Sequence, residues 1–181
     1  MGVKQTGAGS SYVDLAWNAQ LGAGHYHTQF SQDGKNWIDM EYSSSPSDSV
    51  YNLTQGASYY ARVVAYNGSH YSGTHVMVGV SETAIVSTKP TEVTGLTQTA
   101  AGVNSVSMSW NASAGAASYV IYGYINYNWT QIGTSATNSA TITGVAATTS
   151  TKFSVAAVKN VTGGTVTGDQ CSGVELSLIH I

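Results

Sequence analysis

One stretch of this sequence occurs twice in diverged form, and this duplication limits the possible folds more than any other feature. Residues 11–17 read SYVDLAW, and residues 104–110 read NSVSMSW. Tyr26 follows the Trp of the first copy at the same distance at which Tyr119 follows the Trp of the second. A repeat of this length indicates one small domain that was duplicated, rather than a short solenoid unit. We therefore expect two similar domains in the 181 residues of the chain.

Apolar residues alternate with polar ones along most of the chain. Val13, Leu15 and Trp17 would lie on one face of an extended strand, with the residues between them on the other face. The second copy repeats this alternation up to Trp110. Turn signals that contain glycine separate such runs. Short alternating strands at regular spacing are typical of antiparallel β-sandwiches, so the sequence predicts an all-β fold of two tandem sandwiches.

The boundary between the two predicted domains falls beside Pro90. A proline fixes its own φ and favours extended geometry in the residue before it, so we expect a short connection there. The predicted domains are residues 1–88 and residues 89–176. Alignment of the two copies indicates that the first strand of the first domain is truncated at its start. Residues 177–181, SLIHI, resemble translated sequencing-adapter sequence and form a possible non-native tail; alternatively they complete a final strand.

The composition limits the partners and the location of the chain. Charged residues make up only 8% of it, against roughly 25% in an average soluble domain. The net charge is −3 without a basic stripe, which argues against a nucleic acid partner. No apolar run approaches the ~20 residues of a membrane span, so we expect no membrane insertion in this segment. The single cysteine, Cys171, can form no disulfide within the chain, and the cores must hold the fold. A surface rich in Ser, Thr, Gly and Asn favours an extracellular or cell-surface location.

These patterns together resemble tandem fibronectin type III domains, which are immunoglobulin-like sandwiches, as in bacterial secreted or cell-surface proteins. The strand that ends in Trp17 and the segment of residues 53–67 match motifs of the family. In the second copy, the opening at Pro90 and the strand that ends in Trp110 match. The resemblance covers nearly the whole chain and occurs twice.

The resemblance also implies structural roles for three aromatic residues. Trp17 and Trp110 would fill the space between two sheets. Tyr59 resembles the tyrosine-corner residue of the family, whose hydroxyl caps a nearby backbone carbonyl.

Five aromatic residues in the hairpin regions of the two predicted domains are candidate ligand contacts. They are Trp37, Tyr42, Tyr124, Tyr127 and Trp129. Exposed aromatic rings on a β face can stack on sugars, and clustered apolar side chains mark contact surfaces. The alternative explanation is cross-strand packing within each sheet.

Two histidines lie two residues apart in a predicted strand. His25 and His27 share one strand face and could supply two metal ligands. No third histidine, cysteine or carboxylate on the same strand is spaced to join them, and His70 and His75 lie in a loop beside a glycine turn. We therefore predict a surface pair of histidines and no metal site.

The sequence carries no motif typical of an enzyme. Its nine acidic residues are scattered, and it contains neither a nucleophile elbow, nor a phosphate loop, nor a His-Glu-x-x-His pair. We predict that the chain is not an enzyme, has no catalytic residue and needs no cofactor.

The sequence predicts a non-catalytic spacer and interaction module of a secreted or cell-surface protein. Such a module would separate neighbouring domains of a longer chain and contact a protein or polysaccharide surface. The alternative is a carbohydrate-binding accessory module of a polysaccharide-degrading enzyme, with Trp37 and Trp129 as stacking platforms.

Overall fold

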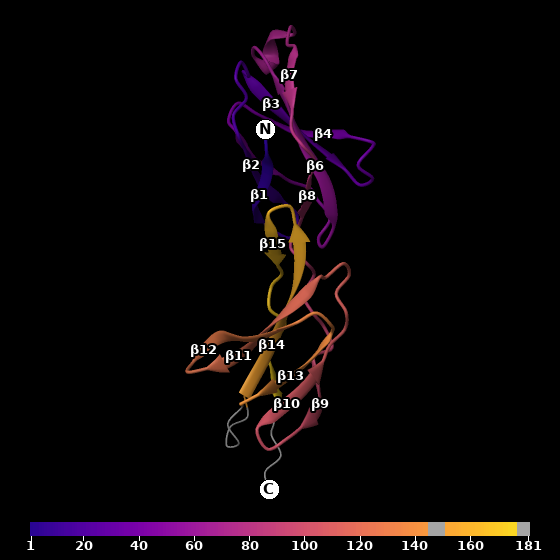
Figure 1. Cartoon of the computed structure of the whole chain (residues 1–181), viewed down its shortest axis with the longest axis vertical. Helices are drawn as coiled ribbons and strands as arrows, with labels where there is room; N and C mark the ends of the chain where they lie inside the picture. Colours follow the sequence, from indigo (N-terminus) through magenta and orange to yellow (C-terminus); the bar gives the residue numbers. More distant parts are fainter. Residues whose placement is uncertain (145–150, 177–181) are drawn as a thin grey trace. The chain divides into compact units, whose positions relative to one another are not determined.

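The computed structural model of the chain describes residues 1–144 and 151–176, which form two compact units of β-structure (Figure 1). The first unit comprises residues 1–89 together with 161–166, and the second comprises residues 90–160 together with those from Thr167 onward. No helix among the described residues is both long and apolar enough to cross a membrane. The predicted tail, residues 177–181, lies outside the described residues. The predicted domain limits, 1–88 and 89–176, stay a prediction.

The first unit is a sandwich of two antiparallel sheets. Its strands are β1 (Val3–Ala8), β2 (Val13–Trp17), β3 (His25–Ser31), β4 (Ile38–Ser43), β5 (Ser47–Val50), β6 (Ser58–Tyr66), β7 (Met77–Val80) and β8 (Ala84–Ser87). One sheet has the order β1-β2-β5, and the other has the order β4-β3-β6-β7 with β8 also paired to β6. A short 3-10 helix, η1 (His70–Ser72), lies in the connection from β6 to β7.

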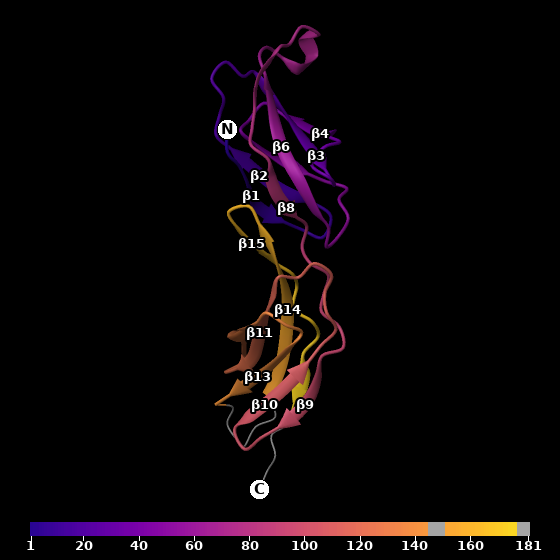
Figure 2. The same ribbon diagram turned by 45° about the vertical axis from the view of Figure 1, so that its right-hand side comes forward.

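The second unit repeats this topology (Figure 2). Its strands are β9 (Thr97–Ala101), β10 (Ser105–Ser109), β11 (Ser118–Ile125), β12 (Asn128–Ser135), β13 (Ser139–Thr143), β14 (Thr151–Val161) and β16 (Val174–Leu176). β15 (Gly164–Thr167) pairs with β14 and extends the same sheet, although residues 164–166 are grouped with the first unit. One sheet has the order β13-β10-β9, and the other has the order β12-β11-β14-β15 with β16 also paired to β14.

The alternation along the strands explains how each sandwich forms its core. On β2, Val13, Leu15 and Trp17 are buried while the residues between them are half-buried. On β3, Tyr26 and Phe30 point into the same core from the opposite sheet. The first core consists of Val3, Val13, Leu15, Trp17, Tyr26, Phe30, Val50, Leu53, Ala61, Val63, Ala65, Ala84 and Val86. The second consists of Val93, Val106, Met108, Trp110, Tyr119, Ile121, Phe153, Val155, Ala157, Cys171 and Leu176.

The two cores contain the same aromatic pair in the same geometry. The rings of Trp17 and Tyr26 meet edge to face at 5.4 Å and 66°, and those of Trp110 and Tyr119 meet at 5.3 Å and 67°. Each tyrosine hydroxyl accepts a hydrogen bond from a backbone N–H of the loop before it, at 3.1 Å and 3.0 Å respectively. The duplication seen in the sequence therefore extends to side-chain packing and to hydrogen bonding.

Tyr59 differs in one detail from what the family resemblance implied. Its half-buried ring packs against Phe30, with ring centroids 5.7 Å apart. Its hydroxyl accepts a hydrogen bond from the backbone N–H of Thr54 at 3.0 Å, rather than capping a carbonyl. The bond still ties the start of β6 to the turn before it, because Thr54 lies in that turn.

Candidate functional site

Three of the five predicted contact residues come together on the hairpin formed by β11 and β12. Tyr124 and Trp129 lie directly opposite each other in the register of the two strands, and their rings meet at 5.3 Å and 62°. Their side chains are 40% and 38% exposed, and Tyr127 at the tip of the hairpin is 89% exposed. We call Tyr124, Tyr127 and Trp129 the aromatic hairpin.

The turn of the aromatic hairpin has an unfavourable backbone conformation. Asn126 and Tyr127 both have positive φ, at 50° and 65°, as the two central residues of a type I′ turn do. Asn tolerates this region, but a bulky residue there costs about 1–2 kcal/mol relative to glycine. Since the Tyr127 side chain is almost fully exposed, packing within the domain does not offset that cost. Backbone strain of this kind is often found at binding positions.

The Trp129 ring is supported by the backbone at Gly173. A Cβ atom added to Gly173 would lie 2.7 Å from Cη2 of the Trp129 ring, so the ring rests on the backbone just before β16. Together with the contact to Tyr124, this support fixes the ring while leaving part of it open. A preorganised aromatic surface of this kind loses little conformational entropy when it binds.

The other two predicted contact residues, both in the first unit, are each covered on one face. The guanidinium carbon of Arg62 lies 4.1 Å above the half-buried Trp37 ring. The exposed Tyr42 ring stacks on His70 at 4.1 Å and 7°. A hydrogen bond with the Tyr71 hydroxyl raises the pKa of Tyr42 above its ordinary value. Arg62 lies over one face of the Trp37 ring, and the use of the opposite face as a stacking platform stays a prediction.

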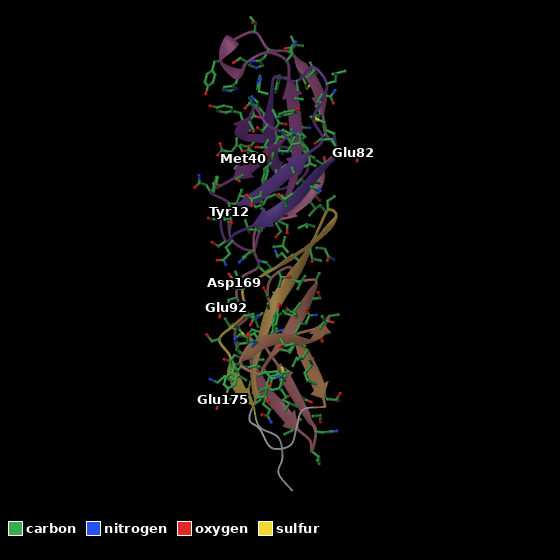
Figure 3. The ribbon with its side chains drawn as sticks, turned by 90° about the vertical axis from the view of Figure 1, so that its left-hand side faces the viewer. Tyr12, Met40, Glu82, Glu92, Asp169 and Glu175 are labelled. Carbon is green, nitrogen blue, oxygen red and sulfur yellow. The ribbon has the colours of Figure 1, made fainter. Side chains whose placement is uncertain are left out.

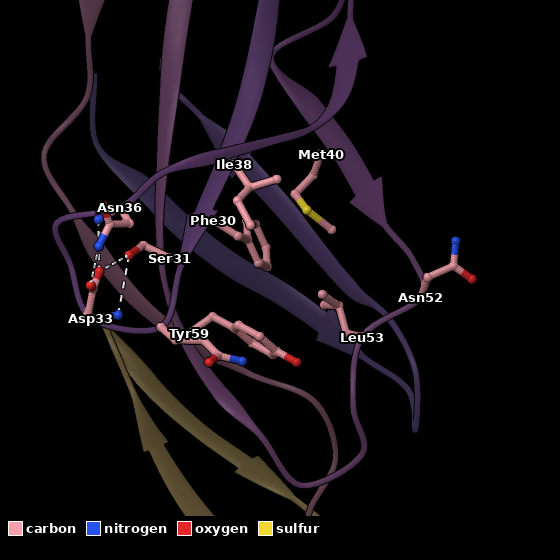
Figure 4. A pocket seen from close by; sticks show the side chains of 10 residues that line it. Phe30, Ser31, Asp33, Asn36, Ile38, Met40, Asn52, Leu53 and Tyr59 are labelled. Atoms are coloured by element: carbon pink, nitrogen blue, oxygen red, sulfur yellow. Dashed lines mark hydrogen bonds between the residues drawn. The ribbon is translucent and has the colours of Figure 1, made fainter.

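The turn between β3 and β4 adjoins a shallow pocket (Figure 4). One oxygen of the Asp33 carboxylate accepts hydrogen bonds from the backbone N–H groups of Lys35 and Asn36, both at 2.8 Å. Ser31 donates a further bond to the same oxygen at 2.8 Å. These bonds hold the pKa of Asp33 well below its usual range. The pocket is lined by Phe30, Ser31, Gln32, Asp33, Asn36, Ile38, Met40, Asn52, Leu53 and Tyr59.

The first unit is expected to become less stable in acid, because protonation removes the negative charge of Asp33 that these hydrogen bonds stabilise. Because the folded-state pKa is lowered, the stabilisation is present above the ordinary pKa of 3.8 and is lost as the pH falls further. The Asp33→Asn variant should unfold at lower urea concentration than the wild type at pH 7, and this difference should shrink below pH ~4. Urea unfolding followed by circular dichroism across this pH range measures it. A difference that stays constant down to pH ~2 would contradict the assignment.

The structure contradicts the predicted surface pair of histidines, because His25 is buried. His25 is only 2% exposed, since the connection from β6 to β7 covers the outer face of β3 at this point. The rings of His25, His27 and His70 lie at mutual centroid distances of 5.3, 5.2 and 5.5 Å, and His75 packs edge to face on His25 at 5.2 Å. The third histidine was missed because it comes from η1 and not from the same strand. We call His25, His27 and His70 the histidine cluster.

The electrostatics of the cluster favour a neutral imidazole at His27. Burial lowers the pKa of His27, and the nearby carboxylate of Asp39 opposes that shift only in part. Asp39 Oδ1 lies 3.9 Å from His27 Nδ1.

The acidic side chains labelled in Figure 3 are exposed. Glu92 accepts a hydrogen bond from the backbone N–H of Ser172 at 3.1 Å, and Glu175 lies 3.8 Å from Lys152. Glu82 and Asp169 lie on other surface segments. The expectation that the chain is not an enzyme stays a prediction.

Comparison with known proteins identifies the fold. No family model matches the chain. The crystal structure of the chicken CNTN1 FN1–FN3 domains matches 97% of this chain and 65% of that one, with a TM-score of 0.52 and 15% sequence identity. The chain folds as two tandem fibronectin type III domains. This confirms the all-β fold predicted from the duplicated pattern.

Two further proteins are similar to these fibronectin type III domains. The match to a two-domain fibronectin type III segment of chicken tenascin covers 96% of this chain and 97% of the tenascin segment, with 16% identity and a TM-score of 0.46. Chitinase A1 of Niallia circulans is 33% identical over 162 residues, which is 85% of this chain. The chain spans only 22% of the length of that chitinase.

Proposed function

We propose that the two fibronectin type III domains form a non-catalytic module of a secreted bacterial enzyme that degrades a polysaccharide. The observation that carries this proposal is the 33% identity to Chitinase A1 over 162 residues. The small share of charged residues, 8%, supports an extracellular location. In this role the module spaces the neighbouring domains of a longer chain and has no nucleic acid partner.

The aromatic hairpin is the surface through which we expect the module to contact polysaccharide. Tyr124, Tyr127 and Trp129 present open ring area on one rigid hairpin. Aromatic rings bury a large apolar area, and an exposed patch of them on a protein surface marks a contact site. Chitin is the first polysaccharide to test because the similar protein is named a chitinase.

The Tyr127→Gly variant distinguishes the role of Tyr127 in polysaccharide contact from its effect on the stability of the domain. Glycine relieves the positive φ at this position, so the variant should be about 1 kcal/mol more stable than the wild type. The same change removes the most exposed ring of the aromatic hairpin, so retention of the chain on insoluble chitin should fall several-fold. Urea unfolding and sedimentation with chitin particles measure the two effects.

Asn126→Gly is the matched control. It also relieves a positive φ in the same turn but keeps Tyr127, so it should retain wild-type binding. Equal binding by Tyr127→Gly, Trp129→Ala and the wild type would refute contact through the aromatic hairpin. Wild-type retention no higher than that of an unrelated protein would refute chitin contact altogether and leave the spacing role.

A further inference from the structure

We propose that His25, His27 and His70 bind a divalent transition-metal ion through three imidazole nitrogens at the end of the first domain where β6 passes into η1. This inference goes beyond the proposed function and does not depend on it. The histidine cluster provides the donor atoms, their spacing and the groups that orient them.

The spacing of the cluster fits a tetrahedral ion. The donor nitrogens of the three residues all lie within 4.8 Å of one another, and His27 Nε2 lies 3.2 Å from His70 Nδ1. With Zn–N bonds of about 2.0–2.1 Å, two nitrogens on one tetrahedral ion are about 3.3 Å apart. The same geometry places the ring centres roughly 5 Å apart. The observed centroid distances of 5.2–5.5 Å agree with that value for all three pairs.

His25 has a buried ring nitrogen without a hydrogen-bond partner among the described residues. Its Nδ1 lies 3.1 Å from the carbonyl oxygen of Gly68, and because a carbonyl only accepts, Nδ1 carries the proton. The Nε2 atom of the neutral ring is then an acceptor. It is buried and has no hydrogen-bond partner among the described residues. A buried acceptor without a partner is costly, and a metal ion would satisfy it. A backbone carbonyl on the other ring nitrogen is the usual support of a metal-bound histidine.

His27 and His70 are oriented by their neighbours in a compatible way. The carboxylate of Asp39, 3.9 Å from His27 Nδ1, favours a proton on that nitrogen and leaves the lone pair on Nε2, which faces His70. Gln29 donates a hydrogen bond to the same carboxylate at 2.8 Å and holds it there. The ring of His70 is fixed by its stacking on Tyr42.

The donor set selects the class of ion. Imidazole ligands suit Zn²⁺, Cu²⁺ and Ni²⁺, whereas Mg²⁺ and Ca²⁺ require oxygen ligands. Three protein ligands leave one tetrahedral position for water or another small ligand. His75 lies further from His27 and His70, with ring centroids at 6.4 and 6.5 Å, and we do not assign it as a ligand. The bound ion would tie the connection between β6 and β7 to β3.

Calorimetric titration of the metal-free, untagged chain with Zn²⁺ tests the proposal. We expect one Zn²⁺ to bind per chain, and no binding of Mg²⁺. His27→Gln and His70→Gln should each weaken Zn²⁺ binding at least about 10- to 100-fold. The control is His180→Gln, which removes a histidine outside the described residues and should leave the affinity unchanged.

A second measurement protects the test against variants that misfold. His70 lies in the connection outside the sheets, so His70→Gln should keep the wild-type circular dichroism spectrum in the absence of metal. Zn²⁺ should raise the melting temperature of the wild type but not that of His70→Gln. Absence of Zn²⁺ binding to the wild type would overturn the proposal. Unchanged affinity in His27→Gln and His70→Gln, or loss of binding only in His180→Gln, would do so as well.

Discussion

Replacing Trp17 with alanine is expected to lower the free energy of unfolding of the first fibronectin type III domain by about 3–5 kcal/mol. Trp17 is buried in the first core, and its ring packs edge to face on Tyr26. Truncation removes that contact and leaves a cavity that the surrounding strands can fill only in part. The loss is a large share of the ~5–15 kcal/mol that a domain has in total.

Urea unfolding followed by far-ultraviolet circular dichroism measures the effect of Trp17→Ala, because fluorescence would itself lose a reporter. Ile38→Ala is the control: Ile38 is a large apolar residue that is 66% exposed, and its loss should change stability by less than about 0.5 kcal/mol. Trp110→Ala should destabilise the second domain by an amount similar to that of Trp17→Ala in the first, since the two aromatic pairs are alike. A loss below about 1 kcal/mol for Trp17→Ala would contradict its position in the core.

Replacing Gly24 with alanine is expected to cost about 1–3 kcal/mol and to disturb the histidine cluster. The backbone N–H of Gly24 donates to the carbonyl of Tyr66 at 2.7 Å, which holds the start of β3 against the end of β6. A Cβ atom at Gly24 would overlap the carbonyl oxygen of Gly68. This oxygen belongs to the backbone and also accepts the bond from His25 Nδ1, so it cannot move aside without breaking that bond.

Two readouts of Gly24→Ala check this expectation. Urea unfolding gives the loss of stability, and the imidazole resonances of His25 in the nuclear magnetic resonance spectrum report the change at Gly68. Gly2→Ala is the matched control because a Cβ atom there meets nothing within 4 Å. A stability within about 0.5 kcal/mol of the wild type, together with unshifted His25 resonances, would show that the close approach is not needed.

The sequence predicted the fold because the information for it is local and occurs twice. Strand alternation around Trp17 and Trp110 depends only on neighbouring residues; β2 ends at Trp17 as expected, and β10 ends at Ser109, one residue before Trp110. The aromatic hairpin was partly predictable in the same way, because Tyr124 and Trp129 lie on adjacent strands joined by a short turn. The strain at Tyr127 was not predictable, since the turn carries no Asn-Gly or Asp-Gly pair.

The histidine cluster escaped prediction because it depends on two segments that are far apart in sequence. His27 and His70 are 43 residues apart and meet only when β3 pairs with β6 in the observed register. That pairing places His25 opposite Tyr66, so that the residues after β6 pass over His25. β3 and β6 are neighbours in this fold, and a search for histidines in the connection that follows β6 would have found His70. The contact of Arg62 on β6 with Trp37, which lies in the loop just before β4, is likewise one that alternation along a single strand does not predict.

The near-identity of the two aromatic pairs bears on how such a chain diversifies. Each domain keeps its interior on one face of its strands, and the positions on the other face are then free to change without touching the interior. Where the first domain has His25 and His27 on either side of its core tyrosine, the second has Ser118 and Val120 on either side of Tyr119. The duplication therefore gave this chain two copies of one scaffold whose outward surfaces could change separately. The first domain carries clustered histidines on that surface, and the second carries exposed aromatic rings.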